Sequence, residues 1–250
     1  MIYCNEKMAY SRTYDIPYFL VDQNRKLRIT ALMQFLEDMA IRHSEKCGVG
    51  LDYYHQNRVA WVLAKWDIEI RNYPEFNRKI TVTTAPTSFR SFFGFRKFDV
   101  TDEQGQFLAK AQTLWIFVDT RQKKPVPVTS EVISAYGLSR DQKQPLPIEA
   151  PTAPETGILQ SRFQVRPGDI DTNRHVNNIR FVEWALDTLP VDFTNSHSVQ
   201  RVLVDYRKEL TIGEEVVAIA DIVEKGSSIE THHRISDGEK EASLITFRWT

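Results

Sequence analysis

The sequence predicts an α+β fold made of two tandem repeats, each with a long helix wrapped by a curved antiparallel sheet. One observation is a repeated motif. D-x-N-R, followed by a basic and an apolar residue, begins at Asp22 and again at Asp171, and each copy leads into an amphipathic run. A second observation is that several β-rich segments, separated by turn residues, follow each amphipathic run. The same order of elements twice indicates a duplicated unit.

The first half is expected to begin extended and then to form a helix over residues 29–47. Apolar residues recur there with a helical period, and Gly48 follows the run. The β-rich runs after this helix predict four strands, over residues 61–71, 80–87, 92–101 and 107–119.

The second half repeats this plan with a shorter helix, expected over residues 178–188 with Asn177 or Asn178 as its N-cap. A shift of 140 residues aligns the first strands of the two halves and places Glu69 on Glu209. The strands predicted here cover residues 199–210, 215–223, 228–236 and 242–249.

The halves are joined by a segment, 141–157, that contains four prolines and few apolar residues. This composition predicts a linker that runs extended along the surface. The expected organisation is an N-terminal domain over 1–140, a linker over 141–158 and a C-terminal domain over 159–250.

The composition is that of a globular protein, with 42% hydrophobic and 26% charged residues. A formal net charge of -1 argues against a nucleic-acid partner. The most apolar run, LWIFV at 114–118, is too short to span a membrane, and the N-terminus lacks an apolar signal core. Cys4 and Cys47 form no disulfide framework and no zinc spacing. We therefore expect a reduced, cytoplasmic protein without a membrane partner.

The residues best suited to chemistry lie just before the second helix. If the chain runs extended after Gly168, the side chains of Asp171, Asn173 and His175 share one side. The helix start beside them offers free N–H groups and a positive dipole end, which suit a carbonyl that becomes an oxyanion. Glu209, expected on a strand, could reach the same place. Two carboxylates, an amide and an imidazole suit activation of water against an acyl carbon.

Simpler interpretations of these residues stay open. Asp and Asn before a helix often only cap turns, and a histidine there is often structural. Glu209 taken alone would be a solvated strand residue. The first copy has Lys26 in place of His175, and a lysine serves as a neutral base near pH 7 only if its pKa falls greatly.

The ligand types at this position also allow the question of metal binding to be tested against the sequence. A calcium loop starting at Asp169 is excluded because Arg174 and Arg180 stand where glycine and glutamate are needed. A transition-metal site made of Asp171, His175 and Glu209 stays open on ligand type alone. No metal and no cofactor is expected.

Two stretches resemble the acyl-acyl carrier protein thioesterases of plant plastids and their bacterial relatives. They are D-x-D-x-N-x-H-V-N-N-x-x-[YF], here 169–181, and Y-R-x-E, here 206–209. The resemblance covers nearly the whole chain and implies a double-hotdog fold. It also implies hydrolysis of the thioester between a fatty acyl chain and the phosphopantetheine arm of acyl carrier protein, which releases free fatty acid and ends chain elongation. It further implies that the first half supplies most of the acyl pocket.

The family pattern places four residues on catalytic positions: Asp171, Asn173, His175 and Glu209. We expect Glu209 or Asp171 to activate water, His175 to share the proton transfer, and Asn173 to position the carbonyl or the water. Direct attack by a carboxylate stays open. Many plant relatives carry cysteine where this chain has Leu210, so a covalent cysteine mechanism is not available there. A plastid transit peptide is also absent, as expected of a bacterial enzyme.

The expected substrate contacts extend beyond these four residues. They are Asn177, Asn178, Leu32, Phe35, Leu36, Trp61 and Trp66. The apolar ones could equally be plain core. For the acidic carrier protein, a basic group at Arg25, Lys26 and Arg28 or at Arg121, Lys123 and Lys124 is a candidate docking surface.

Several alternatives stay open from the sequence. An acyl-coenzyme A thioesterase, a non-catalytic protein that binds acyl thioesters and a dehydratase of the same fold all fit the pattern. Acyl chain length is not readable from it, and the chain is expected to be a monomer or a homodimer.

Overall fold

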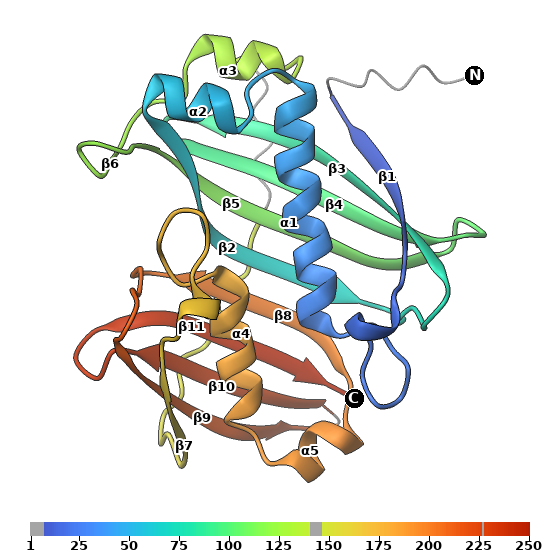
Figure 1. Cartoon of the computed structure of the whole chain (residues 1–250). Coiled ribbons are helices and arrows are strands. Elements are labelled where there is room, and N and C mark those ends of the chain that lie inside the picture. Colours follow the sequence, from blue (N-terminus) through green and yellow to red (C-terminus); the bar gives the residue numbers. More distant parts are fainter. Residues whose placement is uncertain (1–7, 141–146, 227) are drawn as a thin grey trace. The chain divides into compact units, whose positions relative to one another are not determined.

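The computed structural model describes residues 8–140, 147–226 and 228–250, and these form two compact units (Figure 1). Unit 1 comprises Met1–Ala64 and Ile70–Ile148, and unit 2 comprises Lys65–Glu69 and Glu149–Thr250. Part of the expected linker, 141–146, lies outside the described residues. No helix among the described residues is both long and apolar enough to cross a bilayer.

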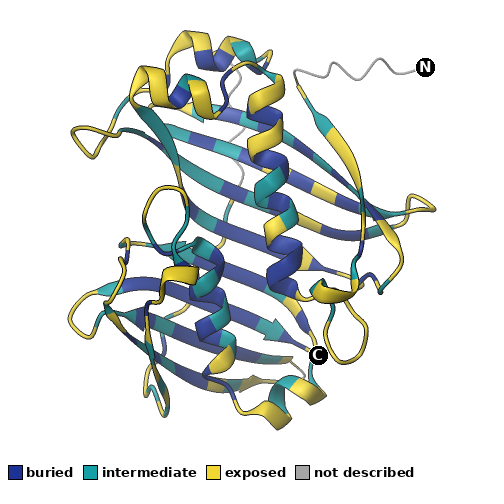
Figure 2. Cartoon of the chain, in the orientation of Figure 1, coloured by how far each residue is buried: buried dark blue, intermediate teal, exposed yellow. Residues whose placement is uncertain are grey.

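Unit 1 places one long helix, α1 (Ile29–Lys46), against an antiparallel sheet. The strand order is β1-β3-β4-β5, and β6 pairs with β5. The strands are β1 (Tyr10–Asp15), β2 (Val59–Ile70), β3 (Lys79–Arg90), β4 (Phe93–Asp102), β5 (Phe107–Asp119) and β6 (Lys124–Pro125). The short helices are η1 (Tyr18–Leu20), α2 (Leu51–Asn57) and α3 (Ser130–Ala135). Figure 2 shows α1 buried on one side and exposed on the other, and Met33, Leu36 and Met39 are fully buried.

Unit 2 repeats this arrangement with α4 (Asn178–Asp187), which packs on β9, β10 and β11. The strand order is β8-β11-β10-β9-β7, and the β2 segment Lys65–Glu69 pairs antiparallel with β8. The strands are β7 (Leu159–Gln164), β8 (Val199–Tyr206), β9 (Glu215–Lys225), β10 (Ser228–Ser236) and β11 (Glu241–Trp249). The short helices are η2 (Pro167–Asp169) and α5 (Val191–Ser196). Each half therefore has the predicted long helix on an antiparallel sheet.

Strand β8 is shorter than the strand predicted for residues 199–210. β8 ends at Tyr206, so Glu209 lies beyond the strand and the expectation that it sits on one is wrong. The reason is a change of backbone partners. The N–H groups of Arg207 and Lys208 both donate to the Ala242 carbonyl, which turns the chain away from β11.

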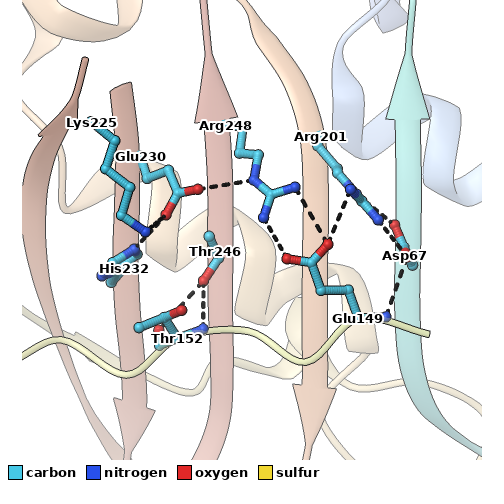
Figure 3. A network of polar contacts seen from close by, with 9 residues as sticks. All are labelled: Asp67, Glu149, Thr152, Arg201, Lys225, Glu230, His232, Thr246 and Arg248. Carbon is cyan, nitrogen blue, oxygen red and sulfur yellow. Dashed lines mark hydrogen bonds and ion pairs between the residues drawn. The ribbon is translucent and has the colours of Figure 1, made fainter. Parts of the chain in front are cut away.

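Residues 149–158, called the strap here, lie across the strands of unit 2 (Figure 3). The backbone N–H of Thr152 donates to Thr246 Oγ1 on β11 at 2.9 Å. The buried Asp221 carboxylate on β9 accepts bonds from the N–H groups of Glu155, Thr156 and Ile158. The predicted extended linker therefore has an ordered part that is hydrogen-bonded to the sheet.

The strap also enters a chain of alternating charges on the sheet (Figure 3). Arg201 forms two 2.9 Å bonds with Asp67 and a 3.1 Å ion pair with Glu149 of the strap. Glu149 also pairs with Arg248, whose Nε donates to Glu230 at 2.9 Å. Burial alone would raise the pKa of Glu230, but its bonds from His232, Lys225 and Arg248 outweigh burial and lower the pKa to about 2. The network therefore stabilises the charged form of this glutamate.

Candidate active site

The segment that carries the predicted site is a tight turn and not an extended strand. The Asp171 N–H donates to the His175 carbonyl at 2.9 Å, and the Arg174 N–H donates to the Asp171 carbonyl at 3.1 Å. The Asp171 carboxylate accepts the N–H of Asn173 at 2.7 Å, and Arg174 adopts a left-handed φ of 66°. The expected alternation of side chains is therefore wrong, because a local side-chain to backbone bond folds the chain back on itself.

The first-half copy of the motif forms the same turn without the histidine. The Asp22 carboxylate accepts the N–H groups of Asn24 at 2.8 Å and Lys26 at 2.9 Å. Arg25 takes the left-handed conformation there, with φ 63°. The aspartate of the motif is therefore needed for the turn even where no imidazole follows it.

The turn brings His175 beside Glu209. The distance from His175 Nε2 to Glu209 Oε2 is 3.2 Å. A backbone bond of 2.8 Å from the Val176 N–H to the Leu210 carbonyl ties the turn to the segment after β8. The His175 side chain is 27% exposed and that of Glu209 is 50% exposed, so a ligand can reach both. Unit 2 therefore holds an imidazole nitrogen and a carboxylate oxygen 3.2 Å apart at its surface.

The same backbone tie in unit 1 identifies the counterpart of Glu209. There the Leu27 N–H donates to the Pro74 carbonyl at 2.8 Å, which makes Tyr73 the residue in the place of Glu209. The sequence alignment that paired Glu69 with Glu209 is wrong by four residues. A slip by an even number keeps the alternation of buried and exposed side chains, so the sequence pattern could not detect it.

Tyr73 gives this corner of unit 1 a different chemistry. Burial raises the pKa of Tyr73, and the nearby Asp22 carboxylate raises it further, so the phenol keeps its proton at neutral pH. With Lys26 and Tyr73 in place of imidazole and carboxylate, unit 1 lacks the pair found in unit 2.

Asn177, and not Asn178, is the N-cap of α4. Its Oδ1 accepts the Ile179 N–H and its carbonyl accepts the Arg180 N–H, each at 2.9 Å. The N–H of Asn178 donates to no described residue, and the Tyr206 hydroxyl donates to the Asn178 carbonyl at 2.9 Å. The sequence predicted several free N–H groups at this helix start. The bonds to Asn177 occupy those of Ile179 and Arg180, whereas the N–H of Asn178 is not occupied by a described residue.

The role of Asp169 near the site was missed from the sequence. Asp169 is 1% exposed and pairs with Arg180 on α4 at 2.7 Å, while its carbonyl accepts the Asn177 N–H at 2.8 Å. Burial would raise the pKa of Asp169, but hydrogen bonds from Arg166 and the Arg180 charge outweigh it and lower the pKa. The sequence signal that could have revealed this role is the pair of aspartates in D-x-D. Asp169 fixes the start of the helix, and Asp171 shapes the turn.

Asn173 is exposed and held by its own turn. Its side-chain amide donates to Asp171 Oδ2 at 3.3 Å, which leaves its side-chain oxygen as an acceptor toward solvent. The Asp171 carboxylate therefore bonds to Asn173 and to the backbone N–H of His175, and the shared catalytic role of the three residues stays a prediction.

The five apolar residues expected to line an acyl pocket are packed against other side chains. The Trp61 ring lies 4.8 Å from that of Phe117 and so close to Gly94 that a Cβ there would be 2.8 Å from it. The Phe35 ring lies 4.6 Å from that of Tyr14. The remaining three are almost fully buried: Leu32, Leu36 and Trp66. Trp66 lies in the β2 segment that belongs to unit 2. A role in acyl binding stays a prediction for all five.

The two basic groups differ in their surroundings. The Arg25 guanidinium lies 5.9 Å from the Phe76 ring, and Arg28 donates to the Phe19 carbonyl. The second group consists of exposed side chains on the turn after β5 and at the first residue of β6: Arg121, Lys123 and Lys124.

No three His, Cys, Asp or Glu side chains in the described part of the chain are grouped as metal ligands would be.

Comparison with known proteins places both halves in one family. The model of the acyl-ACP thioesterase N-terminal domain matches residues 7–136, and that of the C-terminal domain matches residues 153–250. The dodecanoyl-[acyl-carrier-protein] hydrolase of Cinnamomum camphora is 25% identical over 254 residues, covering 95% of this chain. The chain spans 62% of the length of this curated relative and of its Umbellularia californica counterpart.

Solved structures agree in fold. A putative oleoyl thioesterase from Lactobacillus plantarum is 26% identical with a TM-score of 0.91, covering 96% of this chain and 95% of that one. An acyl-ACP thioesterase from Bacteroides thetaiotaomicron, at 24% identity, has a TM-score of 0.82 and covers 97% of this chain and 98% of its own. The predicted double-hotdog fold class is confirmed.

Proposed function

The chain belongs to the acyl-ACP thioesterase family, and on this premise we propose that it hydrolyses fatty acyl thioesters of acyl carrier protein to free fatty acid. The observation that carries the proposal is the 3.2 Å contact between His175 and Glu209 in unit 2. Unit 1 has Lys26 and Tyr73 at the corresponding places. A general base and an imidazole in contact at an accessible surface suit hydrolysis of a reactive ester.

The proposed reaction begins with a water molecule held by Glu209. Its oxygen bonds to the acyl carbon while the proton passes to the Glu209–His175 pair, giving a tetrahedral oxyanion. We assign the stabilisation of that oxyanion to the Asn178 N–H and to the second N–H of the Asn173 side-chain amide. The carbon–sulfur bond then breaks, and the thiolate of the phosphopantetheine arm takes up the proton. A free thiol has a pKa of about 8.5, so this leaving group needs little help from an acid.

Asp171 is assigned a positioning role in this scheme. Its carboxylate holds the backbone of Asn173 and the amide of the same residue, and its counterpart Asp22 performs the same task in unit 1. Of the two carboxylates expected to activate water, Glu209 is the one that contacts the imidazole. We therefore assign general-base chemistry to Glu209.

The experiment follows thiol release from carrier-bound acyl chains of several lengths, with acyl-coenzyme A compared. Glu209→Gln and His175→Ala should each lower kcat more than about tenfold, the lower end of general acid–base contributions. Glu224→Gln, an exposed change on β9, is the matched control and should leave kcat unchanged. Near-normal turnover in both folded site variants would remove the assignment.

A second measurement separates the two routes open to Glu209. Single-turnover hydrolysis in ¹⁸O-labelled water puts the label in the fatty acid if water attacks directly. A covalent anhydride opened at the protein carbonyl instead leaves label in Glu209.

A further inference from the structure

Unit 1 contains a buried arginine without an acidic partner. Arg96 on β4 is 6% exposed and forms no ion pair with any described residue. Its Nη1 contacts His43 Nδ1 at 3.0 Å and donates to Thr84 Oγ1 at 3.1 Å, and the Tyr136 ring lies 5.6 Å from the guanidinium carbon. Arginine is rarely buried unless a partner neutralises it. Since nothing in the proposed reaction uses Arg96, its presence needs another explanation.

The groups around Arg96 have more donors than acceptors. The Tyr54 hydroxyl is buried beside the Ser44 and Tyr136 side chains but has no hydrogen bond of ordinary length and angle in the described chain. The Ser44 hydroxyl donates to the Ala40 carbonyl at 3.0 Å, so the Tyr136 hydroxyl, 2.7 Å away, donates to Ser44. The guanidinium also has a hydrogen bond with the Tyr136 side chain, and its five N–H groups still outnumber the acceptors His43 Nδ1, Thr84 Oγ1 and the Tyr136 hydroxyl. A cluster of this kind would be satisfied by a ligand that supplies an oxygen acceptor.

This polar cluster follows a run of apolar side chains on α1 and on the strands of unit 1. Along the inward face of α1, Leu32, Leu36 and Met39 come first and His43 and Ser44 follow, all of them buried. The facing strands show the same order: Ile80 and Val82 before Thr84, Phe98 beside Arg96, and Ala111 beside Thr113. The contact between Arg96 and His43 joins the polar ends of helix and sheet.

We propose that Arg96 is a specificity-determining residue, the polar end of the acyl site of unit 1. It rejects a chain whose methyl end reaches the guanidinium and accepts a chain that brings a hydroxyl or carboxylate oxygen there. This inference rests on the proposed function, in which unit 1 binds the acyl chain. A terminal methyl group would exclude water from the donors of Arg96 and Tyr54 without accepting a hydrogen bond from them. A terminal hydroxyl or carboxylate oxygen would accept such a bond.

The test compares plain and ω-hydroxy acyl chains of increasing length on the carrier protein. In the wild type, kcat/KM should fall at least tenfold where a plain chain first reaches Arg96, and the fall should be smaller for the ω-hydroxy chain of equal length. Arg96→Met keeps the bulk of the side chain and removes its charge. This variant should raise kcat/KM for the longer plain chain about tenfold and should no longer prefer the ω-hydroxy chain over the plain chain of equal length. An ω-carboxy chain tests whether charge adds to the effect.

The controls distinguish specificity from folding. Lys97→Met changes the next residue of β4, which is exposed, and should leave the length profile unchanged. Tyr54→Phe removes only the unpaired hydroxyl and should raise the rate for the longer plain chain without lowering Tm, which keeps the idea testable if Arg96→Met fails to fold. An unchanged length profile in either folded variant, or an equal loss at every length, would overturn the proposal.

A binding measurement separates this proposal from the hydrolysis itself. Calorimetry with free fatty acids and ω-hydroxy fatty acids of matched length needs no turnover. The His175→Ala variant should prefer the hydroxylated ligand, and adding Arg96→Met should reverse that preference. Equal affinity for the two ligands would contradict the role of Arg96 even if the chain proves to be a thioesterase.

Discussion

At the scale of single residues, Asp171 combines two tasks that Asp22 allows us to separate. Both carboxylates accept backbone N–H bonds in turns of the same shape. Only the turn of Asp171 carries His175 to a carboxylate. A substitution at Asp171 therefore disturbs the turn and the chemistry together, whereas the same substitution at Asp22 disturbs a turn alone.

We predict that Asp171→Ala and Asp22→Ala destabilise the protein by similar amounts, each about 1 kcal/mol, the usual effect of losing such a cap. Only Asp171→Ala should lower kcat strongly, because the imidazole then loses its orientation toward Glu209. Chemical denaturation and thiol-release kinetics on both variants check this. A large loss of kcat in Asp22→Ala would show that the turn acts through general stability.

His233 on β10 is a second residue with a measurable consequence. It is fully buried, its Nε2 bonds to Thr231 Oγ1 at 2.8 Å, and its Nδ1 has no hydrogen-bond partner in the described chain. Burial, with a smaller contribution from the charge of His232, lowers the pKa of His233 from 6.5 to about 3. The folded protein therefore keeps this imidazole neutral where an unfolded chain would protonate it.

The sign of the pH dependence follows from this difference. Between pH 6.5 and about 3 the unfolded state binds one more proton at His233 than the folded state does, so stability falls as the pH falls. The slope is about 1.4 kcal/mol per pH unit for this group alone. His233→Leu should flatten the decline measured by urea unfolding at several pH values, whereas the exposed His55→Leu should not. Parallel curves for all three proteins would disprove this contribution.

At the scale of elements, the sequence predicted long amphipathic and strongly β-rich segments well. α1 and α4 end within one residue of prediction, and β5 and β10 match it. The missed elements are short or lack a pattern of their own, and include α2, α3 and α5. Helices of this length owe their stability to tertiary contacts, which periodicity does not report. The end of β8 was also missed, because it depends on two N–H groups that share the Ala242 carbonyl.

The strap shows how a segment with a linker composition becomes part of a fold. Its prolines prevent a helix or an additional strand, and its backbone donors are satisfied by side chains of the sheet instead. Burial would raise the pKa of Asp221, but the bonds from Thr156, Ile158 and Glu155 outweigh it and hold the pKa well below its usual value. Asp221 is therefore the main attachment point of the strap on β9.

We predict that Asp221→Asn loosens the strap and lowers the free energy of unfolding by about 1–3 kcal/mol, since charge-assisted bonds become ordinary ones. Hydrogen exchange should accelerate at residues 155–158 in this variant and stay slow in α4. Because the pKa of Asp221 is depressed, the wild type should lose this stabilisation as the pH falls below about 4. Unchanged exchange at 155–158 would show that the bonds to Asp221 are not what holds the strap.

At the scale of the whole molecule, the duplication could be read from the sequence more easily than its consequences. The motif repeat located Asp171, Asn173 and His175, because residue type and spacing carry that information. It could not show that Asp171 faces the backbone or that Tyr73 replaces Glu209, because both depend on hydrogen bonds between distant segments. The catalytic role of the four residues stays a prediction, whereas the proximity of His175 and Glu209 is a property of the fold.

The division into units leads to a final prediction about the C-terminal half. Unit 2 includes Lys65–Glu69, which pairs with β8 and supplies Asp67 to Arg201. A fragment of residues 149–250 would expose β8 as an open edge and leave Arg201 without its aspartate. Exposed edges of this kind pair with other chains.

We expect the fragment to form dimers or aggregates in size-exclusion chromatography while the full chain does not do so through this edge. A stable, monomeric 149–250 fragment would show that the second half folds without the β2 segment.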